Sequence, residues 1–264
     1  MCGIAGYSLG GASGADRTLA AQALLAGIAE RGADAVGYAY RCGTEPVHVH
    51  KQRSGASALL DEVVVPQCAS QALVHVRDYT KGHPTIAANN HPVRHGAVIG
   101  IHNGLITNDD ALLHEHGIER ADAEMTVDSE VIFALAERSG STARAFERLR
   151  GSMATAWLDE REPGVLYAAR GVGRPLWLGR GRHELFFAST RDALEVVERT
   201  LEVGLRKSQL AEGRIIAIAD GRVVRTTRFS PDRSFTEESL PSVRAPHEGA
   251  FCLQRLSAIA GIAA

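Results

Sequence analysis

The stretch Met1-Cys2-Gly3-Ile4-Ala5-Gly6 places a cysteine directly after the initiator methionine and continues as an apolar, glycine-bearing segment. Methionine removal is efficient before small side chains, so Cys2 is expected to become the N-terminal residue. It would then carry a thiol and a free α-amine. An amine with a pKa of about 8 can accept the proton that a thiol loses before it attacks. We therefore expect Cys2 to supply both nucleophile and base, with a chance cysteine as the alternative.

The composition is that of a folded, globular protein. The chain has 264 residues, of which 45% are hydrophobic and 23% charged, and its net charge is −2. It has no basic stripe with interleaved aromatic residues, so no nucleic-acid partner is expected. No apolar run is long enough to cross a membrane, and the N-terminus lacks the layout of a secretory signal. We therefore expect no membrane contact and a cytoplasmic location.

The four cysteines are widely spaced and form no C-x-x-C pair. This spacing argues against a zinc ribbon and against a disulfide framework, and it predicts reduced thiols, which suit a reactive Cys2. Two histidine pairs, His48-x-His50 and His114-x-His116, suggest metal binding. No acidic or cysteine ligand accompanies them at regular spacing, so we expect no metal and no other cofactor.

Hydrophobic periodicity predicts helices and strands in separate blocks. Helices are expected over residues 15–30, 54–60, 109–116, 129–138, 141–149 and 192–199. Strands are expected over residues 2–8, 38–41, 47–51, 73–76, 97–101, 153–158, 165–169, 176–178, 185–188, 214–218 and 223–226. Asp220-Gly221 is expected to form a hairpin turn between the last two strands. This order predicts antiparallel sheets packed against helices, with a long functional loop over residues 77–96.

Four clusters of residues require a common explanation. They are residues 2–6, residues 31–37, residues 75–82, and His102-Asn103-Gly104 together with residues 126–130. In this order they resemble the glutaminase domain of class II glutamine amidotransferases. These N-terminal-nucleophile hydrolases form the N-terminal part of glucosamine-6-phosphate synthase and of glutamine phosphoribosylpyrophosphate amidotransferase. The resemblance, over about residues 2–226, implies an α+β fold, a four-layer α-β-β-α sandwich with two central antiparallel sheets, in a domain spanning residues 1–228.

The resemblance also implies a catalytic role for three residues. Cys2 would attack the side-chain amide of glutamine, giving a thioester and ammonia, and water would then release glutamate. The Asn103 side chain and the backbone N–H of Gly104 would stabilise the oxyanion. Glycine at position 104 would also let the backbone approach the ligand closely. On its own, Asn103-Gly104 would be a plain turn.

The far end of glutamine is a zwitterion, and each of its charges needs a partner. The resemblance implies that Arg77 binds the α-carboxylate in a bidentate manner and that Asp128 binds the α-ammonium. The alternatives are a solvated loop arginine and, for Asp128, a helix N-cap. The resemblance further implies that Thr80 and Gly82 belong to the substrate site and that Arg31 and Asp34 support it.

Two departures from the family pattern bear on function. Where the sugar-phosphate synthases carry Trp-Ala-Thr-His-Gly after the arginine, this chain has Asp78-Tyr79-Thr80-Lys81-Gly82. This places two charges in a loop that closes over glutamine in the family and helps to seal an ammonia route. Only about forty residues follow Thr227 in this sequence, so we expect no synthase domain after it. Residues 229–264 are expected to form a linker and a short helical tail, which either packs on the domain or docks a separate synthase subunit.

The sequence therefore predicts a stand-alone glutamine amidotransferase that releases glutamate, and ammonia for a separate acceptor enzyme. Its expected partners are L-glutamine and a separate synthase or acceptor subunit, and a homo-oligomer stays open. One alternative is a hydrolase of a γ-glutamyl amide in a larger substrate. Another is a non-catalytic glutamine-binding regulatory subunit. The presence of Cys2, Asn103 and Gly104 favours an enzyme, because a sensor does not need oxyanion donors.

Overall fold

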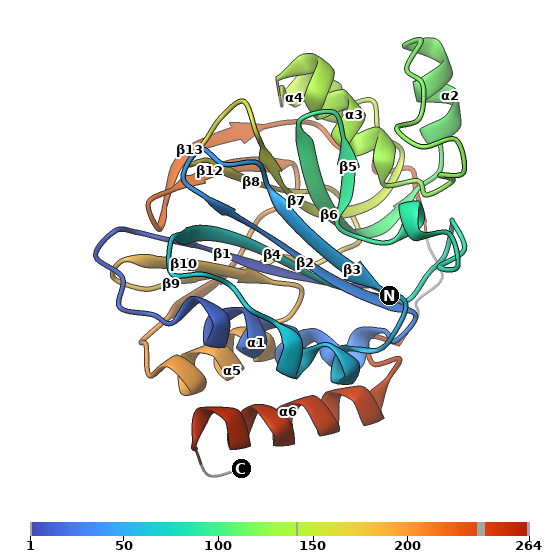
Figure 1. Ribbon diagram of the computed structural model, residues 1–264. Helices are drawn as coiled ribbons and strands as arrows, with labels where there is room; N and C mark the ends of the chain where they lie inside the picture. The colour runs from blue at the N-terminus through green and yellow to red at the C-terminus, as the bar shows by residue number, and fades with distance from the viewer. Residues whose placement is uncertain (1, 141, 237–240, 263–264) are drawn as a thin grey trace.

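A computed structural model describes residues 2–140, 142–236 and 241–262 (Figure 1). Within these residues, the seven strands of one sheet lie in the order β11 (Arg206–Gln209), β9 (Trp177–Arg180), β10 (Glu184–Ala188), β1 (Gly3–Leu9), β4 (Ala69–Arg77), β2 (Ala35–Cys42) and β3 (His48–Gln52). The six strands of the other lie in the order β13 (Arg222–Arg228), β12 (Arg214–Ala219), β8 (Leu166–Arg170), β7 (Gly151–Asp159), β6 (Val98–Ile106) and β5 (Val93–His95).

Helices cover the outer faces of the two sheets (Figure 1). On the seven-stranded sheet these are α1 (Arg17–Ile28), α5 (Arg191–Leu201) and, outside them, α6 (Pro246–Ala260). On the six-stranded sheet they are α2 (Asp109–Glu115), α3 (Glu130–Ser139) and α4 (Ala143–Phe146). Short 3-10 turns are η1 (Ala29–Arg31), η2 (Ala56–Ala58), η3 (Leu60–Glu62) and η4 (Ala87–Asn89). The predicted α-β-β-α sandwich with antiparallel sheets is confirmed.

The strand β1 is central because it is buried on both faces and paired along both edges. It is antiparallel to β10 on one side and to β4 on the other. Successive side chains point to opposite faces of a strand. Accordingly, Ile4 packs in the apolar layer between the two sheets, whereas Ala5 and Tyr7 pack in the layer beneath α1. Cys2 therefore precedes one of the most firmly held strands of the molecule.

Sequence patterns located most elements but missed two strands at the sheet edges. The strands β5 and β11 were not predicted, and the helix expected over residues 54–60 is two 3-10 turns, η2 and η3. The expected loop over residues 77–96 contains η4 and β5. The hairpin turn is confirmed, with left-handed φ angles at Asp220 and Gly221. One residue of the helix predicted over 141–149, Ser141, lies outside the described residues.

The expectation of reduced thiols without a disulfide is wrong for one pair. A disulfide joins Cys42, at the end of β2, to Cys68, just before β4. The two cysteines are 26 residues apart in sequence, but the pairing of β2 with β4 brings their Cα atoms to 5.1 Å. Spacing along the chain did not reveal this proximity, because it arises from strand pairing. Cys2 and Cys252 are free thiols, and the cytoplasmic location stays a prediction.

The C-terminal segment folds back onto the domain. The helix α6 packs against α1, η1 and η2, and it buries Cys252 and Leu256. Of the two expectations for the tail, a helix packed on the domain is therefore observed. Residues 237–240 and 263–264 of the tail lie outside the described residues. The division into a domain over 1–228 and a tail over 229–264 stays a prediction.

Candidate active site

Two polar contacts hold Cys2 at the start of β1. Its Sγ donates to the backbone carbonyl of Asp78 at 3.5 Å, and its own carbonyl accepts from Arg31 Nε at 2.9 Å. Arg31 is buried at the end of η1, and Asp78 follows β4. The nucleophile predicted from sequence is thus fixed between two loops. Met1, whose removal the sequence predicts, lies outside the described residues.

The surroundings of the Cys2 thiol disfavour its spontaneous ionisation. Burial raises the pKa of the thiol, and the positive charge of Arg77 opposes this effect only in part. A thiol in such a place is neutral at rest. It therefore needs a base within reach before it can attack, which is the role that the sequence assigns to the α-amine of the same residue.

Arg77 ends β4 and shapes the loop that follows, residues 78–82. Its Nη1 donates to Asn90 Oδ1 at 2.5 Å. Its Nη2 donates to the carbonyl of Lys81 at 2.9 Å and also to that of Gly82. The solvated-loop alternative is wrong, because Arg77 is only 2% exposed. Its predicted contact with the α-carboxylate stays a prediction.

Residues 31–34 lie against the backbone of the same 78–82 loop. Asp34 accepts from the backbone N–H of Tyr79 at 2.9 Å, and its own N–H donates to the carbonyl of Arg77 at 2.9 Å. The close approach requires glycine at position 32, where a Cβ atom would lie 2.4 Å from the carbonyl carbon of Arg77. Arg31 and Asp34 thus support the loops around Cys2.

The strand β6 carries the two residues predicted to stabilise an oxyanion. The Asn103 side chain is fully buried, and neither its Nδ2 nor its Oδ1 has a hydrogen-bond partner among the described residues. Gly104 has φ +149°, and a Cβ atom there would lie 2.0 Å from the carbonyl oxygen of Ser152. No other residue type fits this backbone. Next to them, the His102 carbonyl lies 3.1 Å from Nε2 of His75 on β4, which joins the two sheets.

Asp128 precedes α3 but does not cap it. The N-cap residue is Ser129, without a side-chain capping bond, and Asp128 Oδ2 instead accepts from the backbone N–H of Ile106 at 2.7 Å. Burial raises the pKa of Asp128 to about 6. Burial lowers the pKa of Arg77. The negative charges of Cys2 and Asp128 act in the opposite direction and raise it. These three groups therefore lie within electrostatic range of one another.

Two contacts that organise the site were missed in the sequence. Asn90 holds Arg77, while its neighbour Asn89 accepts from the backbone N–H groups of Thr126 and Val127 at 2.7 and 2.9 Å. This asparagine pair therefore links the arginine to the segment that leads to Asp128. The only sequence signal was two adjacent asparagines inside a long loop.

The charged loop that departs from the family pattern is neutralised by neighbouring elements. Lys81 Nζ lies 2.7 Å from Asp109 Oδ2 and 3.0 Å from Asp110 Oδ2, both in the first turn of α2. Asp78 Oδ2 lies 3.2 Å from Arg244 Nε. Between them, Thr80 is exposed, and its substrate contact stays a prediction.

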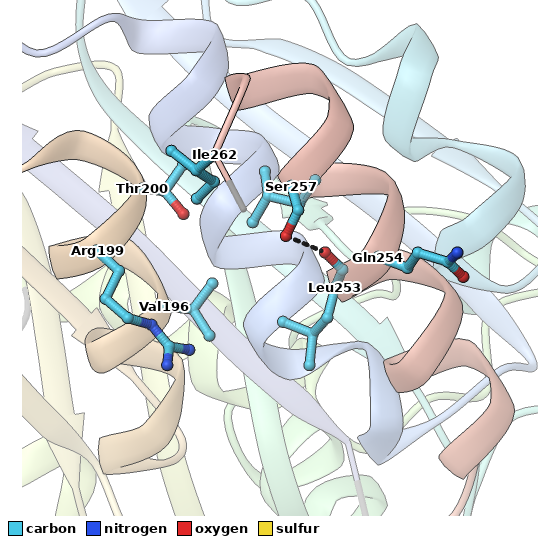
Figure 2. A pocket seen from close by; sticks show the side chains of 8 residues that line it. Val196, Arg199, Thr200, Leu253, Gln254, Ser257 and Ile262 are labelled. Carbon is cyan, nitrogen blue, oxygen red and sulfur yellow. Dashed lines mark hydrogen bonds between the residues drawn. The ribbon is translucent and has the colours of Figure 1, made fainter. Parts of the chain in front are cut away.

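A groove of about 550 Å³ between α5 and α6 lies away from these residues. Figure 2 shows that Val196, Arg199 and Thr200 line one side, with Leu253 and Ser257 opposite. It contains no thiol or carboxylate, so it is not a candidate for the chemistry expected at Cys2.

The described residues contain no group of three or more His, Cys, Asp or Glu side chains placed to hold a metal ion. Among the same residues, no helix has the length and apolarity to cross a membrane.

Comparisons with known proteins show which sequences this chain resembles. Residues 80–196 match the family model described as a glutamine amidotransferase domain. A glutamine–fructose-6-phosphate aminotransferase of Chlorobaculum tepidum is 30% identical over 250 residues, which cover 87% of this chain and 36% of that protein. The enzyme of the same name from Escherichia coli K12 is 32% identical over 225 residues, covering 80% and 35%. The chain thus spans about a third of the length of these curated relatives.

Two solved structures share the fold. Glutamine phosphoribosylpyrophosphate amidotransferase from B. subtilis, complexed with ADP and GMP, has a TM-score of 0.68 at 21% identity, covering 88% of this chain and 50% of that one. A structure described as the allosteric regulatory enzyme of purine biosynthesis has a TM-score of 0.66 at 22% identity, with the same coverage.

Proposed function

Because the chain contains a class II glutamine amidotransferase domain of the N-terminal-nucleophile type, we propose that it hydrolyses the side-chain amide of L-glutamine through Cys2. The products are glutamate and ammonia. Ammonia then passes to an acceptor, on a separate subunit or elsewhere in the same protein. Loss of Met1 exposes the α-amine that starts the reaction.

In the first half of the reaction, the α-amine of Cys2 takes the proton from its thiol, and the thiolate attacks the amide carbon. The carbonyl electrons move onto oxygen. When they return, the C–N bond breaks, and the nitrogen leaves as ammonia with the proton from the ammonium group. In the second half, the amine accepts a proton from water as the hydroxide adds to the thioester. Collapse of this intermediate breaks the C–S bond, and the proton returns to sulfur.

The buried and unpartnered amide of Asn103 is the observation that carries this proposal. A buried polar group without a partner costs about 1–3 kcal/mol, and Asn103 leaves both amide atoms unpaired. This cost in folding free energy is explained if Nδ2 is positioned to donate to an oxyanion. A donor already in place needs no reorganisation when the charge develops. The backbone N–H of Gly104 supplies the second donor.

The zwitterionic end of glutamine lies between Arg77 and Asp128. Arg77 is oriented by Asn90, and the segment before Asp128 is held by Asn89. The two residues that bind the opposite charges of glutamine are thus linked through one pair of adjacent asparagines. Gly82 and Thr80 belong to the loop that closes over the bound amino acid.

The decisive experiment is glutamine hydrolysis by purified protein, measured as ammonia and glutamate in equal amounts. We expect Cys2→Ala to abolish turnover while leaving the fold intact, and intact-mass analysis of the active protein to show a chain that begins at Cys2. A glutamine-like alkylating analogue should modify Cys2 and spare Cys252. Full activity in a population that retains Met1, or activity in Cys2→Ala, contradicts the mechanism.

A further inference from the structure

We propose that Arg244 is a positioning residue that holds the 78–82 loop over Cys2, so that the C-terminal segment 241–260 forms part of the active-site structure. This inference rests on the proposed hydrolysis of glutamine at Cys2. It adds a residue from outside the region in which the sequence resembles the glutaminase family. It also assigns a role in positioning the 78–82 loop to the segment that ends in α6.

Asp78 connects the C-terminal segment to the nucleophile through two different groups. Its backbone carbonyl accepts from the Cys2 thiol at 3.5 Å. Its carboxylate Oδ2 lies 3.2 Å from Arg244 Nε, with 20% of the Asp78 side chain exposed. The residue that contacts the thiol is therefore the same residue that Arg244 holds, and a shift of the C-terminal segment is transmitted directly to Cys2.

The same segment also holds the loop on the other side of Cys2. The backbone N–H groups of Arg244 and Ala245 both donate to the carbonyl of Glu30 at 2.8 Å. The next residue, Arg31, donates to the carbonyl of Cys2. The two hydrogen-bond partners that Cys2 has among the described residues, Asp78 and Arg31, thus lie on loops that contact residues 244–245.

Electrostatics gives Arg244 a second effect on the site. The negative charge of Asp78 raises the pKa of the Cys2 thiol and so opposes formation of the thiolate. A guanidinium paired with that carboxylate offsets its charge. Loss of Arg244 would therefore loosen the loop and also remove one positive charge from beside Asp78.

The helix α6 offers a matched control. Arg255 Nε lies 2.9 Å from Asp61 Oδ1, and both side chains are about half exposed. This ion pair helps to dock α6 on the domain but touches neither loop that contacts Cys2. Arg255→Ala therefore removes an ion pair of the same chemical type from the same segment, without disturbing Asp78.

The test compares Arg244→Ala with Arg255→Ala in the full chain. Hydrogen exchange is followed in the peptide that covers residues 77–83, and iodoacetamide alkylation of Cys2 is timed by mass spectrometry. We expect Arg244→Ala to speed exchange of the loop amides and to slow alkylation, each by about threefold to fivefold, the range set by the weak energies of exposed ion pairs. Arg255→Ala should match the wild type in both measurements, and the melting temperatures of the two variants should agree.

A double-mutant cycle separates the ion pair from general loosening. In an Asp78→Asn background, Arg244→Ala should have no further effect on exchange or alkylation. The proposal is overturned if Arg244→Ala and Arg255→Ala behave alike, or if the effect of Arg244→Ala persists in full beside Asp78→Asn. A wild-type protein that does not hydrolyse glutamine overturns the proposed function instead, a result that these two measurements do not depend on.

Discussion

At the scale of single residues, the unpartnered amide of Asn103 should contribute much to catalysis and little to the stability of the fold. Asn103→Ala removes a buried group that makes no hydrogen bond in the described residues, so the melting temperature should not fall far. The oxyanion exists only after attack, so kcat should fall by about a hundredfold or more, with KM nearly unchanged. Steady-state hydrolysis and thermal unfolding of the variant test both expectations. A raised KM with normal kcat would place Asn103 in ground-state binding.

Asp128 links substrate binding to pH. Its pKa of about 6 means that the carboxylate loses its charge as the pH falls below 6. Since a neutral acid cannot pair with the α-ammonium of glutamine, kcat/KM should decline below pH 6 in the wild type. Asp128→Asn should give a low kcat/KM without this decline. An identical acid limb in the variant would assign the pH dependence to another group.

The same raised pKa predicts that Asp128 lowers stability at neutral pH. The folded state holds the proton up to about pH 6, whereas the unfolded carboxyl has a pKa of 3.8. The contribution of the protonated acid to stability is therefore present below pH 3.8 and is lost as the pH rises through 6. Asp128→Asn should stabilise the protein at pH 7 by about 2–3 kcal/mol, and by little at pH 4. Denaturant unfolding at both pH values measures the difference.

At the scale of elements, the disulfide between β2 and β4 is separate from the site. It lies at the start of β4, whereas Arg77 is at the other end of that strand. Closing a loop of 26 residues restricts the unfolded chain, an effect worth about 3 kcal/mol. Cys42→Ser with Cys68→Ser should therefore lower the free energy of unfolding by about this amount and leave kcat/KM unchanged. Cys252→Ala, which removes a thiol outside the disulfide, is the control, and equal losses in both variants would argue against the disulfide.

Across the whole molecule, local patterns predicted most strands and helices, and the family resemblance implied the four-layer sandwich. Neither revealed the contacts that complete the site. Cys2, Asn103 and Gly104 stand in short motifs next to apolar strands, and such strands are visible in sequence. The edge strand β11 was missed because its residues, Arg206 to Gln209, are polar and lack apolar alternation. Arg244 was missed for a different reason. Its partner Asp78 is 166 positions away, and a single exposed charge carries no sign of such a contact.

The central position of β1 has a consequence for the order of events during synthesis. This strand leaves the ribosome first, but its partners β4 and β10 end only at residues 77 and 188. At about 5–20 residues per second, the second partner emerges roughly 5–20 seconds after the first. During this interval one edge of β1 is unpaired, so the strand that follows Cys2 gains its full set of neighbours only after residue 188 has left the ribosome.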